Sequence, residues 1–332
     1  MTFFLVIAVY TPSMHLIINP SDIYYLTWVR SHDPGEILIL YDQESIQVVF
    51  CDPRTSGLFD SEKYQVCGIR GEWVNKFSDY RHLQTDPDFL TQTLREKIEW
   101  YGVKLSYAKS PIIWERTIKT KAEIELIKIA QTLNKQVYEK ILPFLVPWVT
   151  EKGIARKIQI LQLELWASGP SFPPIVAFGE NSAIPHHSPT ERKLQSEDVI
   201  LIDMWLVYEG YCSDMTRMIY QEHTSDEARK IGQLVTEVTQ SFIWWAKPGM
   251  KVSELDKKAR TLLGEYEPYF THSLGHGVGI DIHESPSVSS KSDEILQEGM
   301  VITIEPGIYI PGKYGARYEE MCIIDKNELS LL

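Results

Sequence analysis

The chain has 332 residues, of which 44% are hydrophobic and 23% are charged, a balance typical of a soluble globular protein with one large domain or two ordinary ones. Its formal net charge is −12 and it has no block of lysines or arginines, which argues against nucleic acid or an anionic membrane as the main partner. The four cysteines are scattered without a Cys-x-x-Cys pair, which favours a reducing cytoplasm over a disulfide framework or a thiolate zinc site.

The first part of the chain, residues 1–112, is predicted to be a small α/β domain. The apolar run from Phe3 to Tyr10 lacks a basic start and is too short to span a bilayer, so it is interpreted as a buried strand, with a signal peptide as the alternative. Further strands are predicted at 14–18, 37–41 and 46–51, between clusters of turn-forming residues. A helix ended by Gly102 is predicted over 87–101.

The second part, residues 113–332, begins with a long predicted helix. Thr120 and Glu123 form a capping box at its start. Apolar residues at helical spacing define its buried face: Ile124, Ile127, Ala130, Val137 and Ile141.

Residues 120–332 contain a weak internal repeat. The segment from Pro147 (PWVTEKGIARKI) resembles the segment from Pro248 (PGMKVSELDKKA), each with a proline, a capping Thr or Ser and an amphipathic helix. Further on, VILID, which ends at Asp203, resembles VITIE, which ends at Glu305. The offsets of 101 and 102 residues predict two related halves, each with helices followed by a strand that ends in an acid.

Two aspartates bracket the apolar segment DMWLVYEGYCSD. If this segment is a hairpin that turns between Tyr208 and Glu209, Asp203 lies directly opposite Asp214. Directly opposed side chains have Cβ atoms about 4.5–5.5 Å apart, where like charges destabilise a sheet. A cation between the two carboxylates would remove this repulsion.

The second half repeats this arrangement with two glutamates. A hairpin centred on Gly312 places Glu305 opposite Glu319, whereas Glu320 alternates to the other face of its strand. Four carboxylates in two facing pairs predict a cation site, with solvated residues at the rim of a sheet as the alternative.

Histidines supply the remaining candidate ligands. Three of them lie among alternating glycines, which let the backbone pass close to other groups: His272, His276 and His283. Two more, His186 and His187, lie in NSAIPHHSPT, where a polar surface loop is the alternative. One imidazole with four carboxylates suits Mn²⁺, Fe²⁺, Co²⁺ or Zn²⁺, and four carboxylates are enough for two ions about 3.5–4 Å apart.

The order Asp, Asp, His, Glu, Glu resembles that of the pita-bread metallopeptidases, which include aminopeptidase P, prolidase, creatinase and methionine aminopeptidase. The matching segments, within about 120–325, are SFPPIVAFGENSAIPHHSPT, VILIDMWLVYEGYCSDMTR, HSLGHGVGIDIHE, ITIEPGIYIPG and ARYEE. The first 110 residues, with NPSDIYYLT as the best local match, look like the small N-terminal domain that methionine aminopeptidase lacks. The resemblance implies an α+β chain, with a creatinase-type N-terminal domain at 1–112 and a pseudo-twofold pita-bread catalytic domain at 113–332.

The resemblance also implies a metal centre. Two divalent ions, Mn²⁺ before Co²⁺, Zn²⁺ or Fe²⁺, would be held by Asp203, Asp214, His276, Glu305 and Glu319. Asp214 and Glu319 would bridge the two ions.

The same resemblance implies catalytic and substrate-binding roles. Water activated by the metals would attack the peptide carbonyl, and Glu305 would carry its proton to the departing amine as general base and then acid. His272 and His283 would orient the substrate and stabilise the oxyanion. His186 would contact the substrate, and Arg317 would hold a ligand or a carboxylate.

One residue departs from the family pattern at the predicted site. The chain has DMW where the family usually has Asp-x-Gly, so Trp205 replaces a glycine. Trp205 lies two residues from Asp203 and should share its face of the strand. We expect Trp205 to line or narrow the substrate pocket, with core packing as the alternative.

The resemblance further implies cleavage of the bond before proline and a homodimer. With it, these features predict a cytoplasmic, metal-dependent Xaa-Pro aminopeptidase that acts on proline-containing peptides. An Xaa-Pro dipeptidase (prolidase) is the alternative within the same chemistry. A non-catalytic pita-bread binding module and a metal-free creatinase-type hydrolase are further alternatives, and the complete ligand set argues against both.

Overall fold

The computed structural model describes residues 14–30, 36–42, 45–68, 79–165, 167–168 and 173–332. The chain divides into two compact units, 1–113 and 114–332. The apolar run from Phe3 to Tyr10 lies outside the described residues, so its strand stays a prediction. Across the described ranges, no helix combines the length and apolarity needed to cross a membrane.

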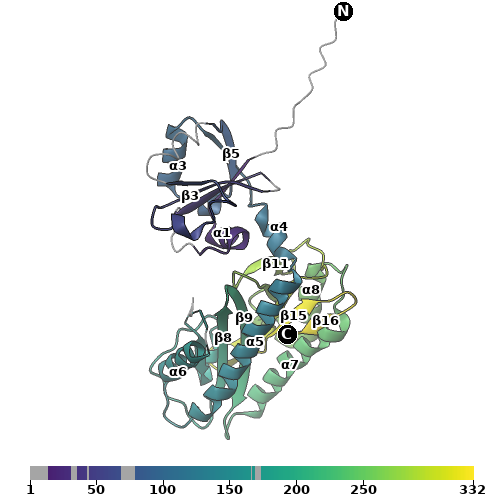
Figure 1. Cartoon of the computed structure of the whole chain (residues 1–332). Helices are drawn as coiled ribbons and strands as arrows, with labels where there is room; N and C mark the ends of the chain where they lie inside the picture. The colour runs from purple at the N-terminus through teal and green to yellow at the C-terminus, as the bar shows by residue number, and fades with distance from the viewer. Residues whose placement is uncertain (1–13, 31–35, 43–44, 69–78, 166, 169–172) are drawn as a thin grey trace, which may run out of the picture. The chain divides into compact units, whose positions relative to one another are not determined.

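The first unit contains a mixed sheet with the strand order β4-β3-β2-β1-β5-β6 (Figure 1). Its elements are β1 (His15–Ile17), α1 (Pro20–Thr27), β2 (Ile37–Tyr41), β3 (Ile46–Cys51), β4 (Val66–Gly68), β5 (His82–Thr85), α3 (Gln92–Trp100) and β6 (Lys104–Tyr107). The three predicted strands are confirmed as β1, β2 and β3. The predicted helix is confirmed as α3, which begins after the N-cap Thr91 and ends before Gly102, whose φ is 80°.

Helix α4 (Ile112–Thr117) follows β6, and the second unit then contains two groups of helices and strands. The first group is α5 (Lys121–Ile141), α6 (Glu151–Glu164), β7 (Ile175–Phe178), β8 (Val199–Tyr208) and β9 (Tyr211–Tyr220). The second group is α7 (Asp226–Trp245), α8 (Val252–Leu263), β10 (Gly275–Gly277), β11 (Glu284–Val288), β12 (Val301–Ile304), β13 (Gly307–Ile310), β14 (Tyr314–Arg317), β15 (Glu320–Ile324) and β16 (Leu329–Leu331).

In the first group, α5 packs on β8 and β9 of the antiparallel sheet β7-β8-β9 (Figure 1). The predicted capping box of α5 is confirmed: the Thr120 hydroxyl accepts from the Glu123 N–H, and the Glu123 carboxylate accepts from the Thr120 N–H. Of the five residues predicted for the buried face of α5, Ile124 is partly buried. The other four are fully buried: Ile127, Ala130, Val137 and Ile141.

In the second group, α8 packs on β11 of the sheet β11-β10-β12-β15-β16, and α7 packs on β16 and on β14 of the β13-β14 hairpin. The repeat is visible in the backbone, because a β-bridge joins Thr150 to Lys193 and an equivalent bridge joins Lys251 to Ile295. Thr150 is the N-cap of α6, as predicted. The predicted cap of α8 is wrong: Lys251 is the N-cap residue, and Ser253 lies inside the helix.

The predicted register of the first hairpin is wrong by two residues. Asp203 pairs with Thr216, and Asp214 pairs with Trp205. The turn residues are Glu209 and Gly210, both with positive φ (43° and 83°), so the turn is centred one residue later than predicted. Because the slip is two residues, Asp203 and Asp214 still share one face of the sheet, as diagonal rather than opposed neighbours.

The predicted register of the second hairpin is confirmed on both sides of the two glutamates. Gly307 pairs with Arg317, and Ile304 pairs with Glu320. Glu305 directly follows β12, and Glu319 directly precedes β15. A buried apolar cluster with residues from both groups, among them Trp205, Val278 and Met321, lies beside these acids and joins the two halves.

Candidate active site

A cavity of about 550 Å³ lies in the second unit and is lined by every residue to which the resemblance gives a role. These residues are His186, Asp203, Trp205, Asp214, His272, His276, His283, Glu305, Arg317 and Glu319. They come from strands β8, β9, β10 and β14 and from the segments that flank β10, β11, β12, β15 and the 3-10 helix η4 (Gly179–Ala183). His187 is absent from this lining; it is buried and lies 2.9 Å from the carboxylate of Glu151.

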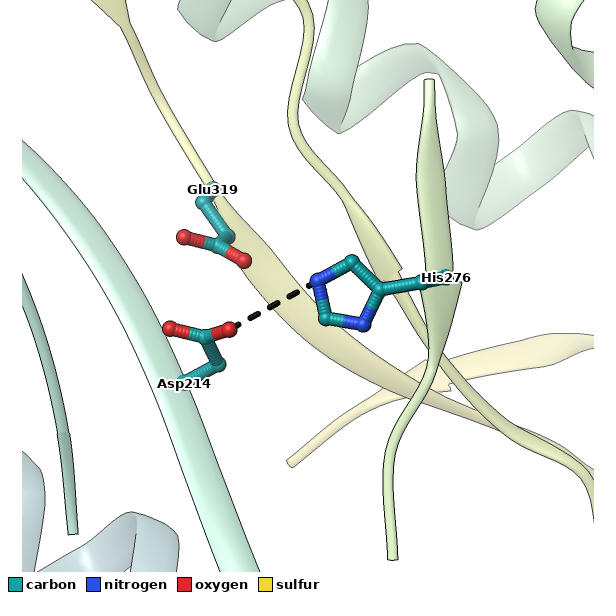
Figure 2. A group of neighbouring side chains, drawn as sticks. All are labelled: Asp214, His276 and Glu319. Atoms are coloured by element: carbon teal, nitrogen blue, oxygen red, sulfur yellow. Dashed lines mark ion pairs between the residues drawn. The ribbon is translucent and has the colours of Figure 1, made fainter. Parts of the chain in front are cut away.

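Three of the predicted ligands form the tightest group in the cavity. One ligand atom from each of Asp214, His276 and Glu319 lies within 4.8 Å of the others. Figure 2 shows the two carboxylates beside the imidazole, with His276 Nε2 and Asp214 Oδ2 3.7 Å apart. Two carboxylates and an imidazole at this spacing are suitable donors for a divalent transition metal.

Glu319 has a carboxylate oxygen that finds no hydrogen-bond partner among the residues the structure describes. The residue is 2% exposed, and its Oε2 accepts a hydrogen bond from Thr216 Oγ1 at 2.7 Å. Its Oε1 is buried and has no hydrogen-bond partner in the described part of the chain. Burial, followed by the negative charge of Asp214, raises the pKa of Glu319. A bound cation would satisfy this oxygen and relieve the repulsion, so the residues fit a metal.

His276 presents Nε2 to the cavity. Its Nδ1 lies 3.1 Å from the carbonyl oxygen of Gly277, so that Nδ1–H donates to the backbone and orients the ring. Its Nε2 lies 3.3 Å from Glu305 Oε1. Burial lowers the pKa of His276, but the hydrogen bond and charge of Glu305 and the charge of Asp214 outweigh it and raise the pKa to about 9. The imidazolium therefore donates to Glu305, and a metal at this position would take the place of that proton.

The glycines around His276 allow close contact between strands, as predicted. A Cβ atom at Gly275 would lie 2.1 Å from the carbonyl oxygen of Thr303 on β12. A Cβ at Gly277 would lie 2.1 Å from the carbonyl oxygen of Ser285. Only glycine at these positions lets β10 bring His276 close to Glu305.

Asp203 and Arg317 form a charge-assisted pair at the edge of this group. Arg317, 4% exposed, donates from Nη2 to Asp203 Oδ2 at 2.7 Å and from Nε to Thr216 Oγ1 at 3.0 Å. Burial raises the pKa of Asp203, and the charge of Arg317 offsets part of that effect. Arg317 thus contacts a candidate ligand, and its contact with substrate stays a prediction.

His272 is part of a hydrogen-bonded chain that the sequence did not reveal. Arg317 Nη1 donates to the Tyr309 hydroxyl at 2.7 Å, and that hydroxyl lies 2.8 Å from His272 Nε2. His272 Nδ1 lies 2.8 Å from the carbonyl oxygen of Ser273. These contacts assign a neutral imidazole that accepts at Nε2 and donates from Nδ1, and burial lowers the pKa of His272 in agreement.

His186, His283 and Trp205 form the remaining predicted part of the lining. Within the described residues, neither His186 nor His283 makes a hydrogen bond through its ring, and both side chains are exposed. The ring of His283 packs edge-on against His276, with centroids 4.3 Å apart. Trp205 is 6% exposed and both lines the cavity and packs in the cluster that joins the halves, so it matches both predicted alternatives.

Sequence reasoning missed Tyr309 and Thr216. Thr216 has a detectable signal, because it follows Asp214 by two residues and must share its face of β9. Tyr309 has none, because its partner His272 lies in another segment 37 residues away.

Several known proteins are similar to this chain. Residues 125–326 match the model of metallopeptidase family M24. An uncharacterized peptidase of Staphylococcus aureus (strain MSSA476) is 34% identical, over 95% of this chain and 93% of its own. Among solved structures, a prolidase from Pyrococcus furiosus is 30% identical with a TM-score of 0.88, over 96% of this chain and 95% of its own. An Xaa-Pro dipeptidase from Bacillus anthracis is 28% identical with a TM-score of 0.89, over 96% of this chain and 92% of the dipeptidase. An X-Pro aminopeptidase from Thermotoga maritima is 26% identical with a TM-score of 0.84, over 96% of this chain and 95% of the aminopeptidase.

Proposed function

The chain belongs to metallopeptidase family M24, and we propose that it hydrolyses the bond between an N-terminal residue and proline with two divalent metal ions. The predicted fold class is an α+β chain in which a smaller N-terminal domain is followed in the sequence by a pita-bread domain. The similar prolidase and peptidase structures confirm it. Family membership also makes the protein a hydrolase that uses divalent metal ions.

The observation that carries the proposal is that Glu319, grouped with Asp214 and His276 in one cavity, has a buried oxygen without a hydrogen-bond partner among the described residues. Asp203 and Glu305 line the same cavity, so five donor residues are available. Four carboxylates exceed what one ion needs, which supports two ions, with Asp214 and Glu319 as the bridging residues. Bound there, such ions supply polarisation of the peptide carbonyl and a lowered pKa of water.

Glu305 is suited to accept and return a proton. Burial raises its pKa, but the hydrogen bond and charge of His276, together with the charge of Arg317, lower it to about 2. Glu305 is therefore ionised in the metal-free protein, where it accepts from the His276 imidazolium. With metal in place of that proton, we propose that the Glu305 carboxylate accepts a proton from the attacking water and passes it to the departing amine.

The histidines and Trp205 would position the peptide. His186 and His283 have exposed rings that are free to contact substrate oxygens, which suits substrate orientation and oxyanion stabilisation. His272 is bonded at both ring nitrogens, so it would act only after its contact with Tyr309 rearranges. Trp205 would form one wall of the pocket.

The choice between aminopeptidase and dipeptidase depends on the space beyond the proline. Solved structures similar to this chain carry both names. We place the Xaa-Pro aminopeptidase first and the dipeptidase second. A non-catalytic binding module would be expected to lose ligands, whereas all five predicted donors line the cavity. Mn²⁺ as the metal, a homodimer and a cytoplasmic location stay predictions.

Hydrolysis of Ala-Pro and Ala-Pro-Ala by chelator-treated protein, with and without Mn²⁺, tests the proposal. Cleavage of the Ala–Pro bond in the tripeptide would establish an Xaa-Pro aminopeptidase, and cleavage of the dipeptide alone would establish a prolidase. A matched Glu305→Gln variant should be inactive on both. Absence of cleavage with any divalent metal would contradict the proposed function and favour the binding module.

A further inference from the structure

We propose that Glu151 is a positioning residue that holds the loop carrying His186 at the active site. This inference rests on the proposed function, in which His186 contacts the substrate. The His186 loop is defined as residues 179–190, between the end of β7 and the segment that leads to β8. Glu151 does not line the cavity, so it can act on the substrate only through this loop.

The Glu151 carboxylate is completely buried in the first turn of α6 and bonds to both ends of the His186 loop. Its Oε1 accepts from the N–H of Phe178 and from Asn181 Nδ2, each at 2.8 Å. Its Oε2 accepts from the N–H of Thr190 at 2.9 Å and from Thr190 Oγ1 at 2.6 Å, and His187 Nε2 lies 2.9 Å away. One side chain therefore joins both ends of the loop.

His186 depends on this loop for its place in the cavity. In the part of the chain that the structure describes, its imidazole makes no hydrogen bond, so the backbone on either side sets its position in the cavity. The next residue, His187, contacts Glu151 directly. A shift of the Glu151 contacts would thus move His186 without removing any atom from the cavity.

The same loop is also held from the second half of the unit. The N–H of Gly315 on β14 donates to Ser182 Oγ at 2.8 Å, and Arg317 Nη1 lies 3.4 Å from the carbonyl oxygen of Pro185. A Cβ atom at Gly315 would lie 2.1 Å from the carbonyl oxygen of Ser182, so β14 and the loop are in close contact. The His186 loop is therefore fixed between α6 and β14.

A buried carboxylate with so many donors is ionised and rigidly held. Burial raises the pKa of Glu151, but the hydrogen bonds from Thr190, His187 and Asn181 outweigh it and lower the pKa. These hydrogen bonds also offset the cost of burying the charge. The concentration of donors on both sides of His186 indicates that the geometry of the loop is what these contacts secure.

The test compares Thr190→Val, which removes one donor to Glu151, with Thr190→Ser, which keeps the hydroxyl. Each is made alone and with His186→Ala, and kcat/KM is measured on the Xaa-Pro peptide that the wild type cleaves. A misplaced catalytic or binding group costs up to about 100-fold in rate, so Thr190→Val is expected to lower kcat/KM by about tenfold and Thr190→Ser by less than about twofold. Glu151→Gln is a stronger variant for use if it folds.

In the His186→Ala background, Thr190→Val is expected to have no further effect, because the group that it misplaces is already gone. An equal loss in both backgrounds, or no loss in either, would overturn the inference. Hydrogen exchange over residues 179–190 gives a readout that does not depend on activity. If the wild type cleaves no Xaa-Pro peptide, the proposed function fails, and hydrogen exchange then tests the role of Glu151 by itself. Faster exchange over residues 179–190 in Thr190→Val, but not in Thr190→Ser, would support that role, and unchanged exchange in Thr190→Val would overturn it.

Discussion

Replacing Glu319 by glutamine is expected to stabilise the metal-free protein and to abolish its stabilisation by metal. Glu319 is 2% exposed, its Oε1 has no partner among the described residues, and the Asp214 carboxylate lies beside it. The glutamine amide keeps an oxygen that accepts from Thr216 and offers an N–H to the Asp214 carboxylate, which removes both the unpartnered oxygen and the repulsion. An unpartnered buried polar group costs about 1–3 kcal/mol, and more when charged. In a unit of this size, each kcal/mol changes Tm by about 2–4 °C. We therefore expect a metal-free Tm about 2–12 °C above the wild-type value.

The neighbouring residue provides a matched control for this prediction. Glu320 lies on the other face of the strand, where it is 2.7 Å from Arg217 and accepts from the Tyr318 hydroxyl at 2.8 Å. Glu320→Gln should lower the metal-free Tm and keep the rise in Tm on addition of Mn²⁺. Scanning calorimetry of chelator-treated protein, with and without Mn²⁺, measures both. The reasoning is refuted if Glu319→Gln lowers the metal-free Tm, or if Mn²⁺ stabilises it as much as the wild type.

Burial raises the pKa of Asp214 and Glu319, so protons compete with the metal at low pH, and the rise in Tm caused by Mn²⁺ should shrink as the pH falls. The folded protein without metal binds these protons more tightly than the unfolded chain, so its stability should fall as the pH rises through the raised pKa values. Measuring Tm against pH, with and without Mn²⁺, checks both expectations. Trp205→Gly should raise kcat/KM for Ala-Pro-Ala relative to Ala-Pro and should lower the free energy of unfolding by about 3–5 kcal/mol, and Trp205→Phe should have an intermediate effect on both quantities. An equal change in kcat/KM for the two peptides would contradict a role of Trp205 in the pocket wall. Lys119→Met should lower the free energy of unfolding by about 3 kcal/mol in urea, because Lys119 is buried and its ammonium lies 2.6 Å from Glu284; a loss under 1 kcal/mol would show that the remaining partners of Glu284 suffice.

Strand positions and the identity of the candidate ligands could be predicted from local sequence, because apolar runs that end in acids are a local pattern. The exact pairing of residues between the two strands of a hairpin could not always be predicted, because it depends on which residues form the turn. The turn at Glu209 and Gly210 needs positive φ at both residues, and placing it one residue too early shifted the pairing of Asp203 from Thr216 to Asp214. The second hairpin has Gly312 at φ 72°, and there the predicted register is confirmed.

Contacts between side chains from distant segments could not be predicted in the same way. The bond from Thr216 to Glu319 spans 103 residues, and the one from Arg317 to Asp203 spans 114. Burial and hydrogen bonding of these groups depend on how the two halves pack, which no local pattern encodes. The roles of Tyr309 and Glu151 escaped sequence reasoning for this reason.

The candidate ligands lie where the two halves of the second unit meet, and this location explains their unusual energetics. Asp203 and Asp214 come from the first half, and His276, Glu305 and Glu319 come from the second. Protein groups satisfy most of the charge at this contact: Arg317 pairs with Asp203 and Thr216 donates to Glu319 across it, and His276 pairs with Glu305 within the second half. Glu319 Oε1 has no donor in the described ranges, and Glu319 is grouped with Asp214, so a cation there would complete the contact between the halves. Binding of metal should therefore protect backbone amides in both β9 and β15 from hydrogen exchange, whereas protection confined to one strand would show that the ion binds one half alone.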